Sequence, residues 1–133
     1  KNFICTRGKD PISVHAEGNF HKDYDIESLK TVSTIGAGDT FNAGFIYGLL
    51  RQHITRDDIQ NGLTEAQWDR LIASGKAFSA ECCKDIYNYV GKEFGLLKKQ
   101  ELWLYGDNFA KIQRLSSVLR SEKHRFNEWK MPI

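Results

Sequence analysis

The sequence contains no long hydrophobic run and no large excess of charge of either sign. No apolar stretch approaches the roughly 20 residues that a membrane-spanning helix requires. The 19 lysines and arginines nearly balance the 17 aspartates and glutamates, and the resulting net charge is only +2. Nucleic-acid binding usually needs a concentrated basic face. We therefore expect neither a membrane partner nor a nucleic-acid partner.

Cysteine is scarce, and its spacing suits neither a disulfide framework nor a zinc site. The three cysteines are Cys5, Cys82 and Cys83, an odd number with two of them adjacent and no CxxC pair. We interpret all three as reduced, partly buried thiols and expect a cytoplasmic protein. The first ten residues, KNFICTRGKD, also lack the long apolar core of a secretory signal peptide.

What is present is the composition of a soluble globular domain. The 133 residues are 41% hydrophobic and 27% charged, enough for one domain with its own core. The chain begins with lysine and is apolar from Phe3 onward. We expect from this that the sequence is the rear part of something longer.

Local patterns predict strands first and helices afterwards, which suits an α/β layer structure. The strands are expected at 2–6 (buried) and 12–16, with a weaker candidate at 29–32 and a further short strand within the polar loop 17–28. The helices are expected at 39–51, from Thr55, from the capping box at Thr64 to about residue 88, and at 108–129, with 91–106 less regular.

The stretch TVSTIGAGDTFNAGFIYGLL places three small residues directly before a carboxylate and a helix. The first N–H groups of a helix lack intrahelical partners and carry partial positive charge. A turn without bulky side chains lets an anion approach them closely. Gly36, Ala37, Gly38 and the N–H of Asp39 are therefore candidates for a phosphate-binding anion hole.

Asp39 would repel a phosphate that is merely bound there. A carboxylate fits this place if the site moves a phosphoryl group onto a hydroxyl, because the carboxylate then accepts the hydroxyl proton. The plainer alternative is a glycine turn capped by Asp39, since Asp is a common N-cap residue. The four residues GAGD alone favour neither interpretation.

The longer segment STIGAGDTFNAGFIYG resembles the C-terminal signature of the ribokinase-like (PfkB) family of carbohydrate kinases. Eight residues fit that pattern in order and without a gap: Gly36, Ala37, Gly38, Asp39, Thr40, Phe41, Ala43 and Gly44. The resemblance implies that Asp39 is the catalytic base and that Gly36 to Gly38 form the anion hole. It also implies that Ala43 and Gly44 are small for packing.

A second match lies upstream, where ICTRGKD resembles the family strand that ends in Thr-x-Gly. The resemblance implies that Thr6 and Gly8 approach the phosphates of the nucleotide. It further implies ATP as cosubstrate, with magnesium carried in by ATP. Potassium activation stays open, because Ser33 replaces the usual Asp and Ile35 replaces a frequent Thr in the segment that surrounds potassium in some members.

The fold implied is the C-terminal, nucleotide-binding part of a ribokinase-like α/β sheet flanked by helices. We assign residues 1–91 to this part and 92–133 to a helical C-terminal extension with a packing or interface role. The acceptor implied is a hydroxyl of a sugar or sugar acid, with the 133-residue chain inactive by itself.

Three alternatives remain: a non-catalytic nucleotide-binding or interaction module, a truncated fragment, and a nucleoside kinase of the same family. A homodimer is one open assembly, because many such enzymes pair through a lid.

Overall fold

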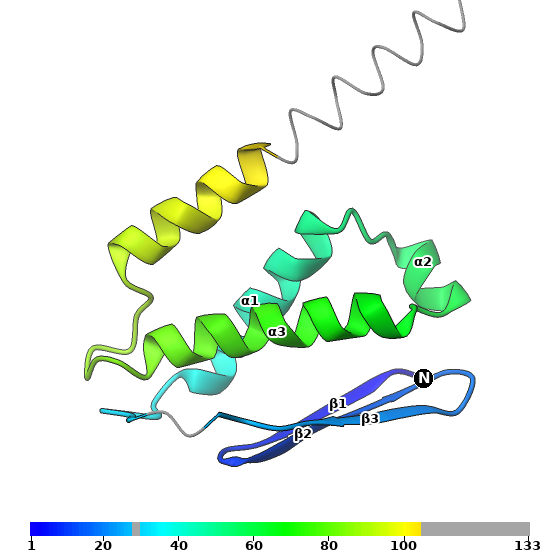
Figure 1. Ribbon diagram of the computed structural model, residues 1–133, viewed down its shortest axis with the longest axis horizontal. Helices are drawn as coiled ribbons and strands as arrows, with labels where there is room; N and C mark the ends of the chain where they lie inside the picture. Colours follow the sequence, from blue (N-terminus) through cyan, green and yellow to red (C-terminus); the bar gives the residue numbers. More distant parts are fainter. Residues whose placement is uncertain (28–29, 105–133) are drawn as a thin grey trace, which may run out of the picture. The chain divides into compact units, whose positions relative to one another are not determined.

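Three antiparallel strands precede the helices, and the computed structural model describes residues 1–27 and 30–104. The strands β1 (Phe3–Arg7), β2 (Asp10–Ala16) and β3 (Phe20–Tyr24) form one sheet in the order β1-β2-β3. In the register, Ile4 pairs with Val14, and Val14 pairs with Lys22. Figure 1 shows this small sheet beneath the helices α1 and α3.

Both hairpins turn at residues with left-handed backbone conformations. Gly8 has φ +65° between β1 and β2, and the loop between β2 and β3 contains Gly18 (φ +81°) and Asn19 (φ +61°). Glycine adopts this region at no steric cost, and asparagine tolerates it better than most residues. The turns therefore follow directly from the local sequence.

Three helices follow: α1 (Ala37–Arg51), α2 (Arg56–Asn61) and α3 (Glu65–Cys82). The capping box expected at Thr64 with Gln67 is present, and the helix start expected at Thr55 has a capping box as well, with Asp58. Each satisfies N–H groups that the first turn of a helix leaves without partners. Residues 92–104 are also helical. The chain divides into two compact units, Lys1–Gly95 and Leu96–Ile133.

The core of the first unit lies between the sheet and the two longer helices. Its buried members come from three elements: Ile12 and Val14 of β2, Phe41 of α1, and Trp68, Leu71 and Ile72 of α3. Fully burying such a side chain contributes about 1.5–3 kcal/mol. The core therefore holds the sheet and the helices together as one unit.

Helices α1 and α3 pack closely because glycines line their contact. An added Cβ at Gly44 would lie 2.5 Å from the backbone oxygen of Ser74, and one at Gly75 would lie 2.6 Å from Phe41 Cε2. The packing role expected for Gly44 is thus confirmed. Ala43, for which the same role was expected, is exposed to solvent.

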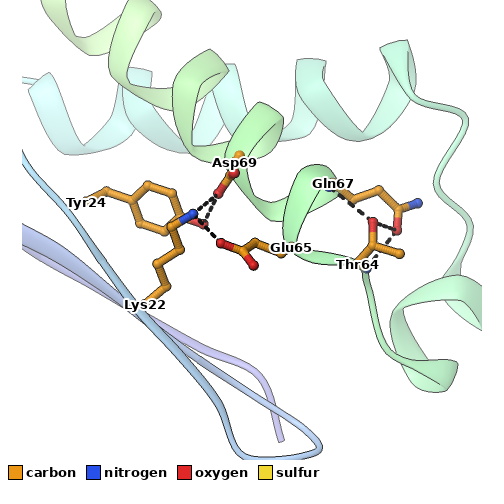
Figure 2. Close-up of polar contacts among 6 residues, drawn as sticks. All are labelled: Lys22, Tyr24, Thr64, Glu65, Gln67 and Asp69. Atoms are coloured by element: carbon orange, nitrogen blue, oxygen red, sulfur yellow. Dashed lines mark hydrogen bonds and ion pairs between the residues drawn. The ribbon is translucent and has the colours of Figure 1, made fainter.

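A polar cluster joins the sheet to α3 on the outside of this core (Figure 2). Lys22 Nζ lies 2.7 Å from Glu65 Oε1 and 2.8 Å from Asp69 Oδ1, and the hydroxyl of Tyr24 donates to Asp69 Oδ1 at 2.8 Å. The hydrogen bonds from Lys22 and Tyr24 lower the pKa of Asp69. Burial, with the hydrogen bond to Asp69, raises the pKa of Tyr24.

The predicted α/β class is confirmed, and most element positions agree with the sequence. Three expectations are wrong. Residues 30–32 form no strand, α3 ends at Cys82 rather than near residue 88, and residues 92–104 are helical rather than irregular. In addition, β1 is largely exposed where a buried strand was expected. Residue 29 and the expected helix at 108–129 lie outside the described residues.

The sequence analysis expected three partly buried thiols and no membrane-spanning helix. Cys5, Cys82 and Cys83 are free; Cys5 is partly buried and the other two are buried. Within residues 1–27 and 30–104, no helix is both long enough and apolar enough to cross a membrane.

Candidate active site

The glycine turn ends in a left-handed residue, which starts α1 without a side-chain cap. Gly36 is the N-cap with φ +76°, and no side chain there accepts a hydrogen bond from the helix. The turn before it is closed by the Ala37 N–H, which donates to Thr34 O at 3.2 Å. Because Gly36 is the N-cap, the alternative that Asp39 caps the helix is wrong.

Three of the four predicted amides in this turn have no protein partner among the described residues. These are the N–H groups of Gly36, Gly38 and Asp39, whereas the Ala37 N–H is engaged within the turn. Gly38 is exposed, and an added Cβ there would meet no atom within 4 Å. Unpaired amides at the positive end of a helix form an anion-binding site.

Asp39 lies in the first turn of α1, one residue beyond the exposed Gly38. Its side chain is exposed, and within 1–27 and 30–104 it makes no hydrogen bond or ion pair. An ionised carboxylate free of cationic partners can accept a proton from a bound hydroxyl. The geometry thus places a proton acceptor beside unpaired amides.

Thr40 braces this turn, although the sequence pattern assigned it no role. Its Oγ1 donates to Gly36 O at 2.9 Å or to Ala37 O at 3.1 Å, and its N–H donates to Gly36 O at 2.9 Å. The carbonyl oxygens of the turn are therefore held toward the helix. Thr40 is one of the eight residues that fit the family pattern, and this fit is the sequence signal that could have indicated its role in the turn.

Thr6 and Gly8 stand at the end of β1 and in the turn that follows it. Both are exposed, and an added Cβ at Gly8 would meet nothing within 4 Å. In the view of Figure 1 this turn and the start of α1 lie toward the same end of the sheet. Across the described ranges, no hydrogen bond or ion pair joins Thr6 or Gly8 to residues 36–39.

The segment ahead of the turn shows how Ser33 is used. Its Oγ accepts a hydrogen bond from the Ile35 N–H at 3.3 Å, so the hydroxyl stabilises the local bend. In the part of the chain that the structure describes, no group of three or more His, Cys, Asp or Glu side chains could hold a metal ion.

Comparison with protein families decides the relationship that these residues indicate. The model of the pfkB family carbohydrate kinases matches residues 1–86. The chain belongs to the pfkB family. A search of curated proteins gave no match.

The match covers β1 to β3, α1, α2 and α3 together, so it includes both the Thr-x-Gly strand and the glycine turn. The recognition from the sequence is confirmed. The three-stranded antiparallel sheet with flanking helices is consistent with a part of the ribokinase-like fold. The pfkB family consists of kinases, so the chain belongs to a family of phosphoryl-transferring proteins.

Proposed function

We propose that this pfkB-family chain takes part in the transfer of the γ-phosphoryl group of ATP to a hydroxyl of a sugar or sugar acid. One observation carries the proposal: the exposed Asp39 follows a left-handed turn whose amides at Gly36, Gly38 and Asp39 lack partners among the described residues. The family match supports phosphoryl transfer as the chemistry.

In the proposed reaction, Asp39 removes the proton of the acceptor hydroxyl as its oxygen attacks the γ-phosphorus. The bond from the γ-phosphorus to the oxygen that bridges it to the β-phosphorus breaks, and ADP leaves. The amides of the turn stabilise negative charge on the transferring group because they are oriented before the reaction begins. Magnesium would enter with ATP and neutralise charge on its phosphates.

Thr6 and Gly8 would lie along the nucleotide phosphates in this proposal. Both are exposed at the end of β1, and the absence of a side chain at Gly8 would permit close approach of a ligand. This role rests on the family match over the strand and the turn that contain them. A cytoplasmic location, expected from the interpretation of the cysteines as reduced thiols, belongs to the same proposal.

The test replaces Asp39 by asparagine in the intact protein and measures ATP-dependent phosphorylation of a panel of sugars and nucleosides. We expect kcat to fall by roughly 10²–10⁴-fold, because the amide cannot accept the proton. Near-normal turnover would reject Asp39 as the base. If only nucleosides are phosphorylated, the acceptor is a nucleoside and the protein is a nucleoside kinase of the same family.

The matched control is Asp57→Asn. Asp57 is also an exposed carboxylate in the first turn of a helix, α2, so the control repeats the loss of charge beside a helix N-terminus. We expect this variant to retain kcat within about twofold, because exposed substitutions away from a site have small effects. ATP binding by calorimetry without any turnover of the intact protein would instead favour a non-catalytic nucleotide-binding module.

A further inference from the structure

The segment that precedes the glycine turn is tied to the end of α3 rather than to the sheet. The Val32 N–H donates to Cys83 O at 2.8 Å. The thiol of Cys82, which is fully buried, lies 3.6 Å from Ile35 O and 3.4 Å from Asn88 Oδ1. A thiol carries one proton, so Cys82 donates to one of these two oxygens at a time.

Asn88 fills the space beside Gly36. A Cβ added at Gly36 would overlap the carboxamide of Asn88, so only glycine fits there while Asn88 keeps its position. Both residues have left-handed backbones, with φ +76° at Gly36 and +54° at Asn88. Asparagine is among the residues that adopt this region most readily. The conformation of Asn88 therefore directs its side chain against the turn at little cost.

We propose that Asn88 is a positioning residue for phosphoryl transfer, whose carboxamide packs against Gly36, with the Cys82 thiol holding the carboxamide in place. The contact fixes the path of the chain at the N-cap and thereby the direction of the Gly38 and Asp39 amides. The proposal rests on the proposed kinase function, but the contact itself lies between residues of this chain. Asn88 acts through Gly36 and touches no reacting atom.

The contact matters because the turn, although its backbone is hydrogen-bonded at Ala37 and Thr40, has little side-chain packing of its own. Gly36 has no side chain, Gly38 meets no neighbouring atom, and α1 has no side-chain cap. Displacement of a catalytic group by about 1 Å can cost on the order of 10²-fold in rate. A neighbour that occupies the open side of Gly36 limits such displacement.

The first experiment compares Asn88→Gly with Asn19→Gly in the intact protein. Both positions are left-handed asparagines, but Asn19 lies in the loop between β2 and β3. Glycine tolerates the same backbone, so each variant removes only a side chain. We expect kcat to fall about tenfold in Asn88→Gly. The KM for the acceptor should stay unchanged, and Asn19→Gly should behave as the unsubstituted protein.

A second readout separates this proposal from the proposed function. Amide hydrogen exchange at Ala37 and Thr40, whose N–H groups donate to Thr34 O and Gly36 O, should be faster in Asn88→Gly than in Asn19→Gly, whether or not the protein phosphorylates a sugar. Equal exchange in the two variants would overturn the positioning role, even if the intact protein is an active kinase. Faster exchange together with an unchanged kcat would also overturn it.

The role of the thiol is tested by conservative rescue. Cys82→Ser keeps a hydrogen-bond donor at this position, whereas Cys82→Ala removes it. We expect the serine variant to keep most of the kcat and the alanine variant to fall as Asn88→Gly does. Equal kcat values in the two variants, with comparable melting temperatures, would show that Cys82 does not hold Asn88.

Discussion

At the scale of single residues, three glycines in and after the turn have three different physical roles. Gly36 supplies a left-handed backbone and leaves room for Asn88. Gly38 leaves the end of α1 open, since nothing lies within 4 Å of a Cβ added there. Gly44 permits the close approach of α3. The sequence pattern groups these residues as one motif. Glycine is needed at Gly36 for backbone conformation, at Gly38 for ligand access and at Gly44 for helix packing.

Substitution of Gly44 by alanine should destabilise the protein. The new Cβ would lie 2.5 Å from the backbone oxygen of Ser74, and a backbone atom cannot move aside as a side chain can. Overpacking of this kind costs about 1–3 kcal/mol. The measurement is the free energy of unfolding from urea denaturation.

The control for this substitution is Gly95→Ala. Gly95 lies within the helical residues 92–104, and an added Cβ there would meet no atom within 4 Å. Alanine in an open helical position gains about 1 kcal/mol over glycine. The free energy of unfolding should therefore fall in Gly44→Ala and rise in Gly95→Ala. Equal destabilisation of the two variants would contradict the packing explanation.

At the scale of elements, the helix starts were predictable and some helix ends were not. Thr64 and Gln67 form the expected capping box because its chemistry is local and lies within four consecutive residues. The end of α3 at Cys82 carries no glycine or proline as a stop signal in the sequence. Residues 91–106 were expected to be less regular, yet 92–104 are helical and the helix includes the exposed Gly95.

The polar cluster between β3 and α3 should make stability depend on acid. The folded-state pKa of Asp69 is lowered by hydrogen bonds from Lys22 and Tyr24. Because its pKa is lower in the folded state, the Asp69 carboxylate stabilises the fold at pH values above its unfolded-state pKa of about 3.9. This stabilisation is lost as the pH falls through the folded-state pKa. Asp69→Asn should therefore lower stability at neutral pH, but the difference from the unsubstituted protein should shrink below about pH 4.

Urea denaturation of both proteins at neutral and acidic pH measures this difference. Tyr24→Phe removes one donor to Asp69 and should cost about 0.5–1.5 kcal/mol at neutral pH. A difference between Asp69→Asn and the unsubstituted protein that is the same at both pH values would show that the carboxylate has no special role.

At the scale of the whole molecule, the sequence predicts the α/β class and the residues of the turn, but not what the turn touches. The helix expected at 39–51 and the strands expected at 2–6 and 12–16 follow from local patterns, so they appear in the structure within a few residues of their expected bounds. The contact of Asn88 with Gly36 joins segments on either side of α1, α2 and α3. No local pattern encodes such a contact, because it depends on how α3 returns to the turn.

The shared core predicts that sheet and helices of the first unit unfold together. Leu71 of α3 is fully buried in the cluster that includes Ile12 and Val14 of β2. Leu71→Ala should cost about 2–5 kcal/mol through lost burial and the cavity left behind. Hydrogen exchange should then accelerate by a similar factor in β2 and in α3. Acceleration confined to α3 would show that the sheet is stabilised separately.

The glycine-lined contact between α1 and α3 also limits how this part of the protein can move. Packed helices slide past one another only by small amounts, and the close approach at Gly44 and Gly75 leaves little free space between α1 and α3. The two helices should therefore travel as a single rigid body during any closure over a ligand. The hinge would then lie in the connecting segments, and Gly36, directly before α1, would keep its distance from Asn88, which follows α3.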